Sequence, residues 1–105
     1  MMINAGGIYA QQKVKGTVFD SASEKALSGV VVSIQGTEIE QLTGIYGEFV
    51  LNNVKTGPQV LKLSLEGFET SFFPITIEAG KELDLGVLTL YPIFKSEIDA
   101  SIIYL

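Results

Sequence analysis

The chemistry open to this chain is limited by the residue types that it lacks. Its 105 residues include no His and no Cys, and all seven cations are Lys. An imidazole base, a thiol nucleophile and the usual zinc ligands are therefore excluded, as is a guanidinium clamp on phosphate. Glu38 and Glu40 have the i, i+2 spacing that places two carboxylates on one face of a strand, where they could act as acid and base. A solvated strand face explains this spacing better, so we predict no enzyme, no catalytic residue, no metal site and no cofactor.

The stretch Thr43–Leu51, TGIYGEFVL, is the next candidate for a site. Two glycines bracket an Ile–Tyr pair and an alternating apolar run follows, so the stretch could be a ligand loop, a metal loop or a turn. Glu48 is the carboxylate beside the loop, whereas a calcium site takes about six to eight oxygens. We interpret the stretch as a turn in which Gly47 takes a positive φ and Phe49 enters the core.

Aromatic side chains are the remaining candidates for ligand binding. A sugar platform needs exposed aromatics, and Tyr46 at a loop tip with Phe68 at another turn is the pair to test. Core packing or simple exposure is the plainer interpretation, so carbohydrate stays a secondary expectation. The net charge of -5 opposes non-specific nucleic-acid binding, and no nucleic-acid partner is expected.

The C-terminal stretch, residues 92–105, is a candidate for binding a protein partner. It reads PIFKSEIDASIIYL and ends in an apolar cluster. The residues that we expect to contact a partner are Ile98, Ile102, Ile103, Tyr104 and Leu105. This tail is expected to be a linker to a following domain, or a strand that pairs with a partner or a second copy. The unpaired edge near Pro74 is a second expected place for strand addition.

The elements that position these residues are predicted to be strands. Apolar residues recur with a period of two and no window shows helical spacing. The runs are 13–19, 30–35, 47–51, 60–65, 71–77 and 83–90, with turn residues between them. We predict an all-β, antiparallel β-sandwich of about seven strands.

Two details of these runs can be tested directly. Pro74 lies inside a strand-like run and marks that strand as an edge or a bulged strand. In the run 83–90, regular alternation would place Leu83, Leu85 and Val87 on one face, and Leu88 with Leu90 on the other.

The length corresponds to one domain. We place the sandwich at residues 13–91, the tail at 92–105 and a leader at 1–12. The leader, MMINAGGIYAQQ, is small, apolar and uncharged, like the second half of a secretory signal peptide cut after Ala10. No apolar run approaches the ~20 residues that span a bilayer, so no membrane span is expected.

Four motifs occur in the same order as in a known family. They are V-x-G-x-V from Val14, L-x-G-V-x-V-x-I-x-G-T from Leu27, T-x-x-x-G-x-F from Thr43, and V-x-x-G-x-x-x-L-x-L-S-x-x-G-F from Val54. The chain therefore resembles the carboxypeptidase-regulatory-like domain, a transthyretin-type (prealbumin-like) sandwich, over about residues 13–91.

The resemblance implies a setting as well as a fold. Similar domains lie at the N-terminus of TonB-dependent, SusC-like outer-membrane receptors of Gram-negative bacteria. This implies an exported, periplasmic accessory domain that contacts the other domains of its receptor during nutrient transport. The alternative is a structural spacer, or an adhesive or carbohydrate-binding sandwich, of another exported surface protein. Stalk sandwiches with Lys–Asn staples are also similar, but Lys13 and Lys15 are expected to point to solvent.

Overall fold

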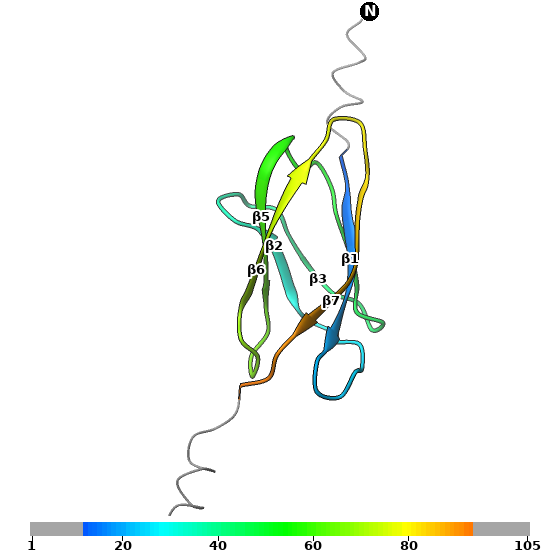
Figure 1. Cartoon of the computed structure of the whole chain (residues 1–105), viewed down its shortest axis with the longest axis vertical. Coiled ribbons are helices and arrows are strands. Elements are labelled where there is room, and N and C mark those ends of the chain that lie inside the picture. The colour runs from blue at the N-terminus through cyan, green and yellow to red at the C-terminus, as the bar shows by residue number, and fades with distance from the viewer. Residues whose placement is uncertain (1–11, 94–105) are drawn as a thin grey trace, which may run out of the picture.

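The computed structural model describes residues 12–93, whose strands pack as two layers (Figure 1). It contains seven strands. They are β1 (Val14–Asp20), β2 (Val31–Ile34), β3 (Glu40–Leu42), β4 (Glu48–Leu51), β5 (Gly57–Ser64), β6 (Ser71–Ile77) and β7 (Leu83–Leu90). The predicted all-β sandwich of about seven strands is confirmed. Among residues 12–93, no helix is long and apolar enough to cross a membrane.

The strands form two sheets, one with the order β4-β1-β7 and one with the order β3-β2-β5-β6. Four of the five neighbouring pairs are antiparallel, as expected. Strands β1 and β7 instead run parallel. The short turn after β6 carries the chain into the other sheet, so β7 joins β1 without a hairpin between them, which is what a parallel pair requires.

The core lies between the two sheets and is built from alternate side chains. Its buried apolar residues are Val14, Val18, Val30, Val32, Ile34, Phe49, Leu51, Val54, Leu61, Leu63, Ile77 and Leu90. Burying each such side chain contributes about 1.5–3 kcal/mol to the free energy of folding. This gain explains why the apolar residues that recur with a period of two face the core. In β1, β2, β4 and β5 these buried residues alternate with more exposed ones, as the period of two predicts.

Strand β7 departs from regular alternation at Gly86. Lys15 pairs with Asp84 whereas Thr17 pairs with Val87, so the register shifts by one residue. Gly86 has φ 69°, and its N–H donates to the Asp84 carboxylate at 2.9 Å. These features define a β-bulge, in which a positive φ favours glycine.

The bulge reverses the faces of the second half of β7. Val87 is 63% exposed, whereas Leu83, Leu85 and Leu88 pack against the core, in which Leu90 is fully buried. The prediction that Val87 shares a face with Leu83 and Leu85 is therefore wrong, because the extra residue inverts the period-two pattern.

The described ends of the chain also contact the sandwich. Gln12, placed in the leader by the sequence, is 5% exposed. Its Nε2 donates to the Val54 carbonyl at 3.2 Å, and its Oε1 accepts from the Gly80 N–H at 3.0 Å. At the other end, the Ile93 N–H donates to the Gly67 carbonyl at 2.9 Å. Sandwich packing thus includes Gln12 and Ile93, beyond the predicted 13–91.

Candidate functional site

The carboxylates considered for acid–base chemistry lie on the surface. Glu38 is in the turn between β2 and β3, Glu40 begins β3, and both are exposed. Residues 12–93 contain no group of three or more His, Cys, Asp or Glu side chains that could hold a metal ion.

The stretch between β3 and β4 forms a tight turn, as the sequence predicted. The Gly44 N–H donates to the Glu48 carbonyl at 3.0 Å, and the Gly47 N–H donates to the Gly44 carbonyl at 2.9 Å. The Glu48 carboxylate accepts from the Tyr46 N–H at 3.1 Å. Glu48 thus uses its side chain to close the turn.

Gly47 fixes this turn against β1. It has φ 79°, and a Cβ at this position would lie 2.5 Å from the Val18 carbonyl oxygen. The Val18 N–H donates to the Gly47 carbonyl at 2.8 Å. Phe49, two residues later, is 3% exposed, and a Cβ on Gly16 would lie 2.9 Å from its ring. The predicted roles of Gly47 and Phe49 are confirmed, and Gly16 makes room for the ring.

Thr43 is a structural residue to which the sequence reasoning assigned no role. It is 4% exposed. Its hydroxyl donates to the Leu27 carbonyl at 2.6 Å and accepts from the Val30 N–H at 3.0 Å. Thr43 thereby joins the β3–β4 turn to the loop that enters β2. Its place at the start of T-x-x-x-G-x-F was the signal that could have pointed to it.

The turn presents two large apolar side chains on its outer side. Ile45 and Tyr46 are each 73% exposed, although the backbone that carries them is well bonded. Phe68, proposed with Tyr46 as a ligand-facing pair, is partly buried against the core and pairs with Pro92. Phe68 therefore packs as part of the sandwich, and Tyr46 belongs to a separate turn. A carbohydrate role for the pair stays a prediction.

The tail residues proposed for partner binding lie outside the described residues. They are Ile98, Ile102, Ile103, Tyr104 and Leu105. Their role as a linker or as a pairing strand stays a prediction.

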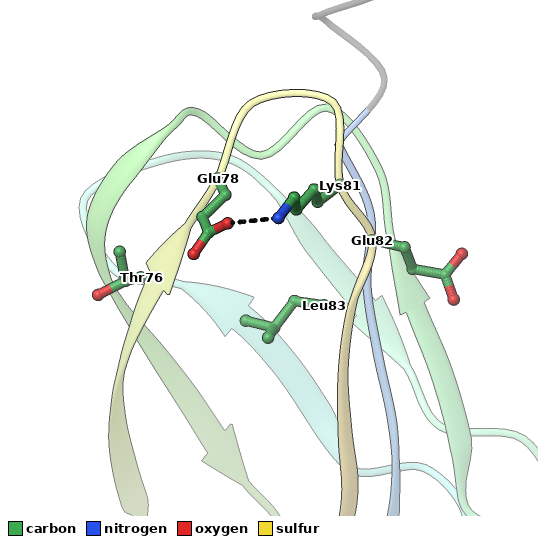
Figure 2. A pocket seen from close by; sticks show the side chains of 5 residues that line it. All are labelled: Thr76, Glu78, Lys81, Glu82 and Leu83. Carbon is green, nitrogen blue, oxygen red and sulfur yellow. Dashed lines mark ion pairs between the residues drawn. The ribbon is translucent and has the colours of Figure 1, made fainter.

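A small cavity of about 150 Å³ lies where β6 turns into β7 (Figure 2). Its lining residues are Thr76, Glu78, Lys81, Glu82 and Leu83. Lys81 Nζ lies 3.2 Å from Glu78 Oε1, with both side chains mostly exposed, and such a pair contributes about 0–1 kcal/mol. The cavity is smaller than the ~300–1,000 Å³ of typical ligand sites, which argues against its being a ligand-binding site.

A second hollow, of about 290 Å³, lies on the outer face of the three-stranded sheet. Lys15 is its cation, with Nζ 2.8 Å from Glu82 Oε2 and 4.0 Å from Asp84 Oδ2. The hydrogen bond and charge of Glu82, together with the charge of Asp84, raise the pKa of Lys15 above its ordinary value of 10.5. The cation is already neutralised by its own sheet, which leaves little to attract an anionic ligand.

Comparison with known proteins adds the family and the fold. The family described as CarboxypepD_reg-like domain matches residues 14–93. No curated protein sequence matches the chain.

Several solved structures share the sandwich at low sequence identity. A chain of the type II cohesin–X-dockerin complex of Acetivibrio cellulolyticus is 16% identical, with a TM-score of 0.65, over 77% of this chain and 58% of that one. The 5-hydroxyisourate hydrolase of Klebsiella pneumoniae is 13% identical, with a TM-score of 0.58, over 79% of this chain and 99% of that one. A minor pilin of Streptococcus agalactiae is 16% identical, with a TM-score of 0.56, over 82% of this chain and 45% of that one.

These likenesses concern the fold alone, because one sandwich can carry unrelated functions. The chain spans 58% of the length of the cohesin–dockerin chain that it matches. The family match is more informative, since it covers residues 14–93, which include all seven strands. On that match, the chain belongs to the carboxypeptidase regulatory-like domain family.

Proposed function

We propose that this domain is a non-catalytic interaction module of an exported protein. The observation that carries the proposal is the family match over residues 14–93. The fold neighbours support it, because one is a chain of a cohesin–dockerin complex and another is a pilin. The rigid turn that exposes Ile45 and Tyr46 adds a surface suited to contact with another protein.

The hydrolase neighbour raises the opposite possibility, that this sandwich is an enzyme. This chain has no His and no Arg, and its carboxylates Glu38 and Glu40 are both exposed. Carboxylates that serve as acids or bases usually have their pKa shifted by burial or by a close partner. The exposed setting of this pair supports the non-catalytic role.

The finer proposal concerns the parent protein. We place the domain in the periplasm of a Gram-negative bacterium, at the N-terminus of a TonB-dependent outer-membrane transport protein, where it contacts the other receptor domains. The similarity of its four motifs to such receptor domains supports this setting.

Reading the gene beyond codon 105 and fractionating the source cells test this setting together. We expect an open frame that continues into a plug and a barrel, and a product in the outer-membrane fraction. A stop codon after Leu105, or a product confined to the cytoplasm, would contradict the receptor setting.

A sugar-binding sandwich is the second candidate, favoured by the 73% exposure of Tyr46. Titration of the labelled domain with soluble oligosaccharides, followed by amide chemical shifts, tests this role. Shifts around Tyr46 that are lost in Tyr46→Ala would support it, and unchanged spectra would leave the protein-contact role as the proposal.

A further inference from the structure

Edge strands carry N–H and C=O groups that no neighbour pairs, and such groups can bind an extended peptide. The described sheets have four edges: β4 and β7 in the smaller sheet, and β3 and β6 in the larger. Hydrogen bonds around each strand show which backbone groups face outward. The four edges differ sharply in this respect.

Strand β6 is an edge, as Pro74 indicated, but Pro74 also closes it. The Val60 carbonyl accepts from the Gln35 N–H at 2.9 Å, so the polar groups of Val60 face away from β6. Val60 pairs with Pro74, and Pro74 must therefore direct its nitrogen toward the open side. Because proline has no N–H, the middle of this edge lacks a donor. The expected strand addition near Pro74 is thus disfavoured.

The two edges of the smaller sheet are restricted in other ways. In β7, the bulge at Gly86 interrupts the row of outward groups, and the Asp84 carboxylate occupies the Gly86 N–H at 2.9 Å. In β4, which has four residues, the Gly44 N–H occupies the Glu48 carbonyl at 3.0 Å. Bulges and short edges are common protections against strand pairing.

Strand β3 is shorter still, with three residues, but it contains no proline and its pairing with β2 shows no bulge. The Ile34 N–H donates to the Ile39 carbonyl at 3.1 Å, and the Thr43 N–H donates to the Val30 carbonyl at 3.0 Å. Residues 39 and 43 therefore face β2, and so does Gln41 between them. By alternation, Glu40 and Leu42 each direct an N–H and a C=O outward. All three residues of β3 are exposed, so these groups can be reached by a partner.

The side chains along this edge change from acidic to apolar. Glu38 and Glu40 are exposed at its start, and the ion pairs among the described residues involve only Lys15 and Lys81. Within residues 12–93, neither carboxylate forms an ion pair with a cation. Toward the turn, three apolar side chains are exposed at 59–73%, namely Leu42, Ile45 and Tyr46.

We propose that the β3 edge binds an extended peptide segment of a partner protein by strand addition. The outward groups of Glu40 and Leu42 supply the hydrogen bonds. Charge complementarity requires Lys or Arg opposite Glu38 and Glu40, and apolar residues opposite Leu42 and the turn. In an antiparallel pairing, the N-terminal half of the peptide is apolar and its C-terminal half is basic. This inference deepens the proposed interaction role and does not depend on the transport setting.

The direct test titrates a blocked heptapeptide, Ile-Thr-Ile-Thr-Lys-Thr-Lys, into the full isotopically labelled chain and follows amide shifts and amide exchange. We expect the shifts to centre on the amides of Glu40 and Leu42, with slowed exchange at both. A peptide with Glu in place of both Lys should bind more weakly. A peptide N-methylated at the second Ile and the first Lys, which lie opposite Leu42 and Glu40, should lose binding.

Two variants make the test specific to this edge. Leu42→Pro removes one outward N–H, which repeats at β3 what Pro74 does at β6, and should abolish the slowed exchange at residue 40. Glu40→Lys should weaken binding about three- to fivefold, whereas Glu66→Lys, the same change on the exposed β5–β6 turn, should leave it unchanged. If Leu42→Pro does not fold, the N-methylated peptide still tests the backbone contact.

The proposal is overturned by an absence of shifts, by shifts centred on 72–76 or 87–89, or by unchanged binding of the N-methylated peptide. Shifts at Glu40 and Leu42 that depend on protein concentration without peptide would identify a second copy as the occupant, and would also overturn it. A cytoplasmic product would contradict the transport setting alone, because the titration uses the isolated chain.

Discussion

Strands β3 and β6 are the two edges of one sheet. Their sequences suggest that β6 pairs more readily with an added strand, whereas their backbone groups favour β3. Strand β6 has seven residues, SFFPITI, and β3 has three, EQL. Judged by side chains, β6 is the hydrophobic edge. Judged by backbone groups, β6 lacks a central donor at Pro74, whereas Glu40 and Leu42 of β3 each present a donor and an acceptor.

The difference shows that an edge strand can accept another strand only where its N–H and C=O groups are present and point outward. Hydrophobic side chains add contact area once a strand has been added, but the backbone bonds set whether it can pair. The support beneath each strand differs too. The end of β3 is held by Thr43 and Gly47, which tie the β3–β4 turn to β1 and to the loop before β2.

The largest loss of stability should come from disrupting the contact between Gly47, in the turn after β3, and strand β1. Gly47→Ala combines a positive φ with a Cβ 2.5 Å from the Val18 carbonyl oxygen, and should lower the free energy of unfolding by about 3 kcal/mol. Chemical denaturation measures this loss. Gly36→Ala is the control, because Gly36 has φ 83° with open space around it, and should cost about 1 kcal/mol. Equal losses in the two variants would show that the contact with β1 is unimportant.

A second test removes the hydrogen bonds that hold the β3 end. Thr43→Val keeps the shape but leaves the Val30 N–H and the Leu27 carbonyl without their partner. We expect a loss of about 2 kcal/mol in the free energy of unfolding. Thr76→Val, at an exposed position on β6, should change it by less than about 0.5 kcal/mol. Similar losses at the two sites would contradict the unequal support of the two edges.

A third test makes the β6 edge able to pair with another strand, and it should affect stability less than the two changes near β3. Pro74→Val restores an outward N–H and should change the free energy of unfolding by less than about 1 kcal/mol. It should also create self-association that grows with concentration, as measured by sedimentation equilibrium. Pro58→Val, on the inner strand β5, adds no donor to that edge and should stay like the parent. A strictly monomeric Pro74→Val protein would show that Pro74 does not close the edge.

The smallest effect concerns the loop that leads from β1 toward β2. The Ala22 N–H donates to the Asp20 carboxylate at 2.8 Å, and this bond lowers the pKa of Asp20 below its ordinary value of 3.8. A lowered folded-state pKa stabilises the fold above the unfolded value, and this stability is lost as pH falls through the folded value. An NMR titration should place the Asp20 midpoint below 3.8, and Asp20→Asn should remove this acid-dependent step. A midpoint at or above 3.8 would contradict the bond.

Much of the fold could be predicted because local patterns carry it. Alternation of apolar residues indicated β1, β2, β4, β5, β6 and β7, and the glycine spacing indicated the turn at Gly47. Strand β3 was not predicted, since Glu-Gln-Leu has neither β-branched residues nor an apolar face. The buried roles of Gln12 and Thr43 depend on partners far along the chain, such as Gly80 and Leu27.

The candidate surface shows the same division. The sequence pointed to Pro74 and to the exposed aromatic Tyr46, because both features are local. It also pointed to the carboxylates of Glu38 and Glu40 as a solvated strand face, but not to the outward backbone groups of Glu40 and Leu42, which are defined only by the register of β3 against β2.

The sequence by itself determined that this chain is a β-sandwich, that residues 43–47 form a turn, and that imidazole and thiol chemistry are excluded by the absence of His and Cys. Side-chain alternation and glycine φ preferences are local, so they can be read residue by residue. Only the tertiary structure decided that β7 runs parallel to β1, that Gly86 inverts its faces, and that β3 is the open edge. Each of these depends on which strand lies beside which, and in what register, because neighbouring strands alone determine where a backbone N–H points.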